Sequence, residues 1–248
     1  MAVALSFAAG FVDIVGALKI FDLFTAHVSG TTVRLAQRLV EHRWGEATAA
    51  VTIVCVFFGA SLLGRVLIES AQRSGFRRVA SITFGIEWLL LVCVLVIGTT
   101  RLSDASPPHA PTAITYLLLA MLAAAMGLQT ASLTRIGPLT VHTTFVTGMI
   151  NKLAQVTSLW IFAAYDLRFG RDHSRDPALV ELASTNARKV RFLASLWILY
   201  VVGAASGTLL TAREQFAALY WPCGILLAVI IVDQRRPLSI EEEQEQAE

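Results

Sequence analysis

The chain has 248 residues, of which 55% are hydrophobic and only 15% are charged, with a formal net charge of +2. This composition is typical of integral membrane proteins and excludes an ordinary soluble globular domain. The net charge is small and no basic stripe is interleaved with aromatic residues, so we expect no nucleic-acid partner. Membrane lipid is the one partner that composition indicates.

Apolar windows of about 20 residues, long enough to cross a hydrocarbon core, recur along the chain. They lie at about 2–20, 47–68, 79–99, 113–133, 192–212 and 215–232. We therefore expect an all-α integral membrane protein with six transmembrane helices. The first window lacks the basic segment and cleavage site of a signal peptide, so we expect it to be retained.

A duplicated motif lies between the windows. Residues 24–37, FTAHVSGTTVRLAQ, return at 142–155 as HTTFVTGMINKLAQ, with six identical positions. Chance would supply about one identity at average residue frequencies. Each copy also follows an apolar run with a glycine, because Gly10 lies 20 residues before Gly30 and Gly127 lies 21 before Gly148. The pattern predicts a duplicated unit.

The duplication divides the single membrane domain, 1–248, into smaller units. We assign a first repeat to 1–100, a hinge to 101–112, a second repeat to 113–233 and an acidic cytoplasmic tail to 234–248. Each repeat has three windows and a short broken or re-entrant helix, at 24–41 or 142–160. If these short helices do not cross, the second repeat enters from the opposite side, which predicts a 3+3 inverted repeat. The sequence leaves open whether they are re-entrant, interfacial or spanning.

Positive charges test this topology, because Lys and Arg gather on the cytoplasmic side of membrane proteins. With six spans, thirteen basic residues lie on the side of the termini and six on the other side. Arrangements with seven or eight spans separate the basic loops and fit less well. We therefore expect both termini in the cytoplasm, with the hydrophilic segment 165–190 as a surface loop on that side.

Two carboxylates fall inside the predicted spans, Asp13 and Glu87. An ionised carboxylate near the bilayer centre costs about 2.5–3.5 kcal/mol on insertion scales, so both should face protein or water. Asp13 is either a proton or cation site or a helix-end acid paired with Lys19 or Arg34. Glu87 has no basic residue within a turn or two, which favours a role as a coupling-ion or proton site.

The motif supplies candidate solute contacts. Its hydroxyl groups can cap a helix N-terminus, and the partial positive charge of that terminus favours an anionic or dipolar group. Basic residues one turn later add charge. The alternative is that the motif only packs helices, with its basic side chains extending to lipid headgroups. The candidate substrate-binding residues are Ser29, Gly30, Thr31 (or Thr32), Arg34, Gln129, Thr147, Gly148 and Lys152.

Other chemistry lacks support in the sequence. No His, Asp, Glu or Cys set has metal-ligand spacing, so we expect no metal and no cofactor. No serine has a base and an orienting acid nearby, so we expect no catalytic residues and no enzyme. A homo-oligomer is compatible with the sequence but not indicated by it.

Four motifs in order resemble the YoaK family of bacterial membrane proteins. The resemblance covers both halves and implies a six-span protein of the bacterial inner (plasma) membrane, with a domain of unknown function. The family pattern has asparagine where this chain has Thr31 and Thr130, so a ligand bound by those amides would be bound differently here. The motifs are Ala9-Gly-Phe-Val-Asp13, His27-Val-Ser-Gly-Thr-Thr-Val-Arg34, Met126-Gly-Leu-Gln129 and Thr143-Thr-Phe-Val-Thr-Gly148.

The leading hypothesis is a secondary transporter or permease for a small polar or anionic solute. The alternative is a non-transporting assembly or lipid-binding protein, in which the repeat only packs helices and the basic 168–191 segment contacts anionic lipid. A mid-depth cavity lined by both motif copies would favour transport, whereas solid packing around them would favour the alternative.

Overall fold

The computed structural model describes residues 1–20, 22–74, 79–102, 112–132, 135–136, 139–140, 146–169 and 176–235. Nearly all of them are helical, as the sequence predicts. The helices are α1 (Ala2–Lys19), α2 (Val28–Val40), α3 (Trp44–Arg73), α4 (Val79–Arg101), α5 (Ala113–Ser132), α6 (Val146–Phe169), α7 (Pro177–Glu214) and α8 (Tyr220–Arg235). Strands β1 (Arg135–Ile136) and β2 (Leu139–Thr140) pair antiparallel between α5 and α6, and a 3₁₀ helix η1 (Gln215–Leu219) joins α7 to α8.

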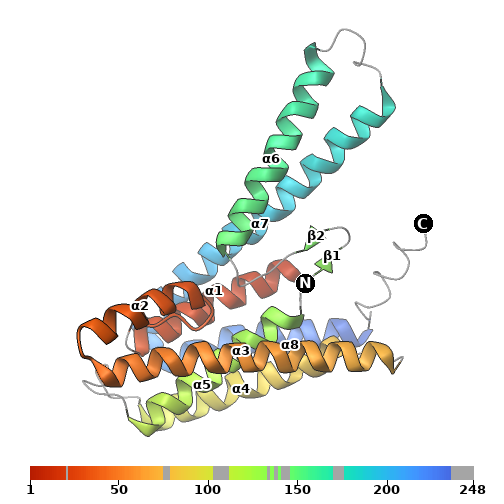
Figure 1. Ribbon diagram of the computed structural model, residues 1–248. Coiled ribbons are helices and arrows are strands. Elements are labelled where there is room, and N and C mark those ends of the chain that lie inside the picture. The colour runs from red at the N-terminus through yellow and green to blue at the C-terminus, as the bar shows by residue number, and fades with distance from the viewer. Residues whose placement is uncertain are drawn as a thin grey trace.

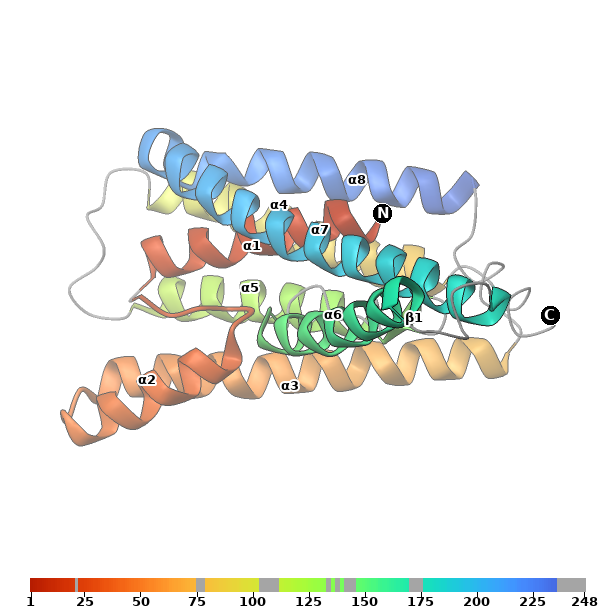
Figure 2. The same cartoon turned by 90° about the horizontal axis from the view of Figure 1, so that it is seen from above.

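Five helical segments of the described chain are long and apolar enough to cross a membrane: Ala2–Lys19, Trp44–Ala71, Ser81–Arg101, Ala113–Ser132 and Pro177–Arg235. The last segment has 59 residues and contains both of the predicted windows at 192–212 and 215–232. These windows do not form one straight helix. Gln215 has a φ of 57°, and after η1 the chain runs back as α8, which packs beside α4 (Figure 2).

Helices α1, α3, α4, α5 and α8, together with the second half of α7, form a bundle (Figure 1). Helix α1 is central, with 67% of its apolar span buried, whereas only 11% of the span in α3 is buried. Large apolar side chains of α3, such as Phe58 and Leu62, are exposed, as expected for a surface that faces lipid. The core is built around fully buried side chains that include Phe11, Phe84 and Leu122.

Helix α6 and the first half of α7 leave this bundle and pack against each other (Figure 1). A second apolar cluster, made of Ala2, Met149, Val156, Leu193 and Leu196, joins them to the start of α1. The expectation of a surface loop over 165–190 is wrong for its described residues, because α6 continues to Phe169 and α7 begins at Pro177. Asp176 caps α7 by accepting a hydrogen bond from Ala178 N at 2.9 Å, and proline occupies the first helical position.

The two motif helices differ in length. Helix α2 has 13 residues, but α6 has 24 and continues to Phe169, well past the expected end at 160. Gly30 and Gly148 nevertheless take equivalent places, because each is the third residue of its helix. Helix α2 packs on α3, and α6 packs on α7. Residues 142–145 of the second motif copy and residues 103–111 of the hinge lie outside the described residues.

Two close glycine contacts between helices occupy equivalently spaced positions along the chain. A Cβ built on Gly10 would lie 2.2 Å from the carbonyl oxygen of Tyr200 in α7, and one built on Gly127 would lie 2.6 Å from that of Phe57 in α3. The two glycines are 117 residues apart, and the two contacted residues are 143 apart. Contact α1–α7 and contact α5–α3 therefore use matching positions in the two halves.

A second pair of contacts keeps the same spacing. Gly207 of α7 packs on the backbone of Phe11 in α1, and Gly64 of α3 packs on that of Leu128 in α5. Phe11 and Leu128 are again 117 residues apart, and Gly64 and Gly207 are again 143 apart. Helix α1 is parallel to α7, and α5 is parallel to α3, because from one contact to the next the residue numbers increase in both helices of each pair.

Helices α1 and α5, which begin the two halves, run in opposite directions. The side chain of Gln129 reaches the carbonyl oxygen of Leu5 at one end of the pair. At the other end, a Cβ on Gly16 would lie 3.6 Å from the side chain of Leu122. Residue numbers rise along α1 as they fall along α5, so the two helices are antiparallel.

Candidate functional site

The buried carboxylate of Asp13 in α1 is the centre of a polar cluster. Its Oδ1 atom accepts a hydrogen bond from Ala26 N at 2.7 Å and a long one from Thr25 Oγ1 at 3.5 Å. Its Oδ2 atom lies 2.6 Å from His27 Nδ1 and accepts a hydrogen bond from Tyr200 Oη at 2.9 Å. Asp13 is only 2% exposed, so protein groups rather than water satisfy its charge.

The proton positions in this cluster follow from its geometry. Tyr200 donates its hydroxyl hydrogen to Asp13, and His27 Nδ1 lies 3.0 Å from the same hydroxyl oxygen. Beside an ionised Asp13, His27 Nδ1 carries a hydrogen, which it shares between the carboxylate and the tyrosine oxygen. The His27 side chain is 27% exposed, against 3% for that of Asp13. Histidine is thus the member of the cluster through which solvent can exchange protons with the carboxylate.

Three segments bring the cluster together. Asp13 comes from α1, Tyr200 from α7, and His27 is the residue immediately before α2. The close contact of Gly10 with the Tyr200 backbone sets the distance between α1 and α7. Asp22, with a φ of 56°, turns the chain after α1 and directs residues 23–27 back along that helix. A larger residue at position 10 would separate the carboxylate from the tyrosine.

Within the described part of the chain, the cluster occurs in one half only. The spacing of 117 residues places Thr130 in α5 where α1 has Asp13, and the spacing of 143 places Phe57 in α3 where α7 has Tyr200. Neither residue can reproduce an ionised carboxylate or a phenol hydroxyl at its position. The backbone contacts are therefore duplicated while the chemistry is not.

Glu87 in α4 is a second buried carboxyl group, 1% exposed. Neither of its oxygens has a hydrogen-bond partner within the part of the chain that the structure describes. It lies one turn after Thr83, whose hydroxyl accepts a hydrogen bond from Ser132 of α5 at 2.8 Å. The thiol of Cys223 in α8 is close enough to Glu87 to interact with it electrostatically. Glu87 thus faces the interior between α4, α5 and α8.

Gln129, a predicted solute contact, is fully buried in α5. Its Nε2 atom donates a hydrogen bond to the carbonyl oxygen of Leu5 in α1 at 2.9 Å, whereas its Oε1 atom has no partner among the described residues. Ser6, one residue further along α1, donates to the carbonyl oxygen of Leu196 in α7 at 2.8 Å. These two side chains hold α1 between α5 and α7.

Thr25, Ala26 and His27 of the first motif copy belong to the Asp13 cluster, whereas its helical part lies largely at the surface. The sequence predicts that Ser29 and Thr31 or Thr32 cap the helix, but α2 has no side-chain cap. Ser29 is exposed, Thr31 donates to the carbonyl oxygen of Phe24 at 2.6 Å, and Thr32 donates to that of Val28 at 2.8 Å. The capping expectation is wrong because the hydroxyl groups bond to carbonyl oxygens instead of the free N–H groups.

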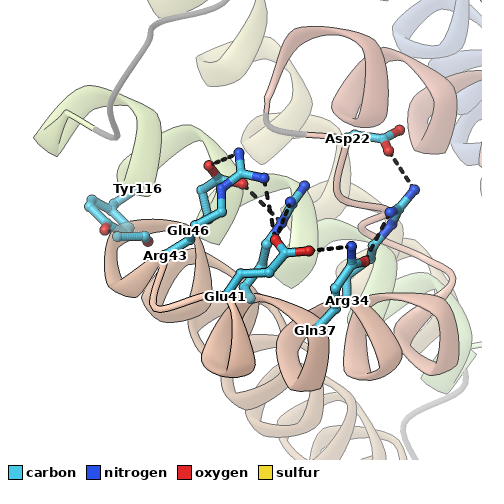
Figure 3. A network of polar contacts seen from close by, with 9 residues as sticks. Asp22, Arg34, Gln37, Glu41, Arg43, Glu46 and Tyr116 are labelled. Carbon is cyan, nitrogen blue, oxygen red and sulfur yellow. Dashed lines mark hydrogen bonds and ion pairs between the residues drawn. The ribbon is translucent and has the colours of Figure 1, made fainter.

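Arg34 belongs to a network along the exposed face of α2 (Figure 3). Its guanidinium lies 2.7 Å from Asp22 Oδ2 and donates to Gln37 Oε1 at 3.2 Å. Gln37 Nε2 in turn donates to Glu41 Oε1 at 2.7 Å. This amide, more than the nearby guanidinium groups, holds the pKa of the Glu41 carboxyl below its ordinary value of 4.5.

The network continues to the start of α3 (Figure 3). Arg38 Nε lies 3.0 Å from Glu46 Oε2, an ion-pair contact without the alignment of a hydrogen bond, and only 10% of the Arg38 side chain is exposed. Arg43 also pairs with Glu46. Tyr116 of α5 donates to the carbonyl oxygen of Gly45 at 2.9 Å, which ties the start of α3 to α5.

The second motif copy has a different setting. Thr147 is exposed, and Gly148 and Lys152 are partly buried on α6. A groove of about 490 Å³ runs along one face of α6. It is lined by that helix alone, so it is not the mid-depth cavity with both motif copies that would favour transport. The lining residues are Ile150, Leu153, Ala154, Thr157, Ser158, Ile161 and Phe162.

The structure thus joins one predicted site residue, Asp13, with two that sequence reasoning missed, His27 and Tyr200. It does not join Asp13 with Glu87, which lies in a separate interhelical region. Within the described ranges, no group of three or more His, Cys, Asp or Glu residues could hold a metal ion. The arrangement can exchange protons and form hydrogen bonds.

The chain is a helical protein of membrane type, with polar clusters buried between apolar helices. It belongs to the family described as "Protein of unknown function (DUF1275)", whose family model matches residues 1–232. This membership is consistent with the resemblance to the YoaK family. No curated protein and no solved structure matches the chain.

Proposed function

We propose that the protein is a secondary transporter or permease for a small polar or anionic solute. The observation that carries the proposal is the burial of two carboxyl groups, Asp13 at 2% and Glu87 at 1% exposure, inside helices apolar enough to cross a membrane. Ionisable groups in such helices are costly, and they commonly mark ion pathways or proton relays. A protein that only packed helices would gain stability by replacing the unpaired Glu87 with an apolar residue.

The matching helix contacts support an inverted repeat as the framework. We propose six crossings in a 3+3 arrangement, with α7 and α8 as separate spans and both termini cytoplasmic in a bacterial inner membrane. The opposite directions of α1 and α5 and the constant spacings of their glycine contacts agree with such a repeat. Many secondary transporters have inverted repeats that rock against each other around a central site.

In this proposal the carboxyl groups and the polar motif residues have different roles. Asp13 and Glu87 bind the coupling ion or proton, and Gln129, whose buried Oε1 has no partner among the described residues, offers an acceptor to the solute. Arg34 and Lys152 supply positive charge near the two helix starts, where Ser29, Gly30, Thr147 and Gly148 offer backbone donors. Thr31 would contact the solute through its side chain, because its N–H is bonded to the carbonyl oxygen of His27. The partners are membrane lipid and the solute, and the proposal includes no enzymatic step.

A second candidate is a non-transporting assembly or lipid-binding protein. It is favoured by the groove on α6, which is lined by one helix and does not include Asp13 or Glu87. The tight glycine contacts also suit a purely structural role for small residues. The two candidates differ in whether neutralising the carboxyl groups changes solute movement.

The test is solute uptake by purified protein in proteoliposomes. The vesicles receive a panel of small solutes, namely lactate, acetate, phosphate, glycine, glutamate and glycerol, with an inward proton gradient, and mass spectrometry measures their contents. We expect at least one solute to enter faster than in protein-free vesicles. Asp13→Asn and Glu87→Gln should abolish that uptake, because each removes a titrating group while keeping side-chain size.

The matched control is Glu69→Gln, which removes an exposed carboxylate that pairs with Arg73 on α3. It should leave uptake at the wild-type rate. Entry of every solute at the rate of protein-free vesicles would contradict the proposal, as would uptake that Asp13→Asn and Glu87→Gln leave unchanged. Either result would favour the structural role.

A further inference from the structure

Within the connector between α1 and α2, residues 22–27, the last three residues all contact one side chain, that of Asp13. Asp13 accepts hydrogen bonds from Ala26 N at 2.7 Å and Thr25 Oγ1 at 3.5 Å, and it lies 2.6 Å from His27 Nδ1. These are three successive residues of the connector. The same carboxylate accepts a hydrogen bond from Tyr200 of α7. One carboxylate therefore holds α1, α7 and the start of α2 together.

The ionised form of Asp13 accepts hydrogen bonds from the groups around it. A proton on Oδ2 turns that oxygen into a donor toward His27 Nδ1 and removes the negative charge that strengthens the bonds from Ala26 N–H and the Tyr200 hydroxyl. Hydrogen bonds to a charged acceptor are about twice as strong as neutral ones, so protonation weakens both of these bonds. It weakens the contacts to the connector and to α7 at the same time.

We propose that Asp13, His27 and Tyr200 form a proton-operated latch on the α1–α2 connector. The carboxylate closes the latch, and uptake of one proton opens it and releases residues 25–27 and the start of α2. This inference rests on the proposed transport function and deepens it, because it names the proton as the coupling ion and the connector as the part that moves.

His27 provides the path for the proton. Its side chain is 27% exposed, whereas that of Asp13 is 3% exposed. A proton from water adds to His27 Nε2, the Nδ1–H bond breaks, and an O–H bond forms on Asp13 Oδ2 across the 2.6 Å contact. The histidine ends neutral with its hydrogen on Nε2, and the cluster has gained one proton. Tyr200 keeps its own hydrogen throughout.

Other charged groups on the surrounding elements do not contact the carboxylate. Lys19 ends α1, and Asp22 pairs with Arg34 of α2 at 2.7 Å. Helix α5 has no charged side chain, and on α8 Asp233 bonds with Ser81 at the far end of α4. The charged side chains of α7 lie toward the two ends of that helix, at Glu181, Arg188, Lys189, Arg191, Arg213 and Glu214. The pH response of the latch therefore belongs to Asp13 and His27.

Cysteine labelling measures opening without any solute. Cys55, Cys93 and Cys223 are replaced by alanine, and Ala26→Cys places a thiol on the connector at a position that is 6% exposed. Its rate of reaction with a maleimide is divided by that of Ala36→Cys, an exposed site on α2, to remove the effect of pH on the thiol itself. The ratio reports the fraction of molecules with an open latch.

The expected result is a low ratio at pH 8 that rises as pH falls. The slope should approach about tenfold per pH unit before levelling off, as for one titrating group. Asp13→Asn should give a high ratio at every pH. His27→Asn, which keeps a donor near the Nδ1 position, should retain the pH dependence. Tyr200→Phe should raise the labelling ratio at pH 8, because the latch loses one of its hydrogen bonds.

Two controls separate opening from unfolding. Asp22→Asn breaks the neighbouring ion pair of the connector and should leave the labelling curve unchanged. A parallel series keeps Cys223, which is 6% exposed in α8, as its one thiol, and its labelling should stay slow in every variant and at every pH. Fast labelling of Cys223 in Asp13→Asn would show unfolding, and the result would then rest on Tyr200→Phe and His27→Asn.

The proposal is overturned if the ratio does not depend on pH in the wild type, or if Asp13→Asn stays closed in a folded protein. It is also overturned if Asp22→Asn, rather than Asp13→Asn, removes the pH dependence. Failure of the transport proposal would look different. In that case the latch would still open with pH, but no solute of the panel would enter vesicles.

Discussion

Replacing Gly10 by alanine tests whether the close contact of α1 with α7 sets the geometry of the cluster. A Cβ at this position would lie 2.2 Å from the carbonyl oxygen of Tyr200, where ordinary contact begins near 3.4 Å. The helices must therefore separate by about 1.2 Å. Passed on to the Tyr200 side chain, this shift would lengthen its 2.9 Å bond to Asp13 to about 4 Å, beyond hydrogen-bond range.

The magnitude follows from two opposing effects. Overpacking a tight contact costs about 1–3 kcal/mol, while replacing a helical glycine by alanine gains up to about 1 kcal/mol. Gly59→Ala in α3 is the matched control, because a Cβ there meets nothing within 4 Å. The difference between the two variants isolates the packing effect, so we expect Gly10→Ala to be about 1–3 kcal/mol less stable than Gly59→Ala.

Reversible unfolding in mixed detergent micelles, followed by circular dichroism, gives both free energies. The labelling ratio at position 26, measured at pH 8, should also rise in Gly10→Ala and stay low in Gly59→Ala. The reasoning is refuted if Gly10→Ala is as stable as Gly59→Ala, since the helices would then tolerate a Cβ at this contact.

Further predictions concern three other groups. Glu87→Leu should raise the free energy of unfolding by about 1–3 kcal/mol, because it removes a buried carboxyl group that has no hydrogen-bond partner among the described residues; uptake should fall to background, and lower stability would contradict the account. The pKa of Glu41 is depressed in the folded state, so its contribution is present above the ordinary value of 4.5 and is lost as pH falls below it. When the unfolding midpoint is measured against pH, Gln37→Ala should reduce the loss of stability below pH 4.5. An unchanged loss would exclude the Gln37 amide as the cause of the lowered pKa of Glu41. Arg38→Met should lower the free energy of unfolding by about 1–3 kcal/mol, because it leaves the nearly buried Glu46 carboxylate without this partner. Arg73→Met removes an exposed ion pair and should lower it by less than about 1 kcal/mol in the same assay.

The helices that cross the bundle could be predicted because their apolar windows are long and uniform. The windows at 2–20, 47–68, 79–99 and 113–133 correspond to α1, α3, α4 and α5. The segment 165–190 was harder, because its charges suggested a loop. Packing of α6 against α7 supports helix up to Phe169 and from Pro177 onward despite the charges, and Asp176 caps the start of α7. The cap signal was available in the sequence.

The candidate site could be predicted only in part. An acid in an apolar span singles out Asp13, but its partners are 14 and 187 residues away along the chain, and no local pattern specifies such contacts. One signal could have found Tyr200. It follows an apolar run and lies three residues before Gly203, so its hydroxyl must be buried at a close helix contact, where it needs a hydrogen-bond partner.

Proton movement during solute entry tests the central claim most directly. Proteoliposomes that contain a pH-sensitive dye receive the panel solute that enters fastest, with no initial proton gradient. The account predicts that the lumen acidifies as the solute enters, and that Asp13→Asn abolishes this change while Glu69→Gln preserves it. Solute entry without a change in lumenal pH, or an equal change in Asp13→Asn, would contradict a proton-coupled site at Asp13.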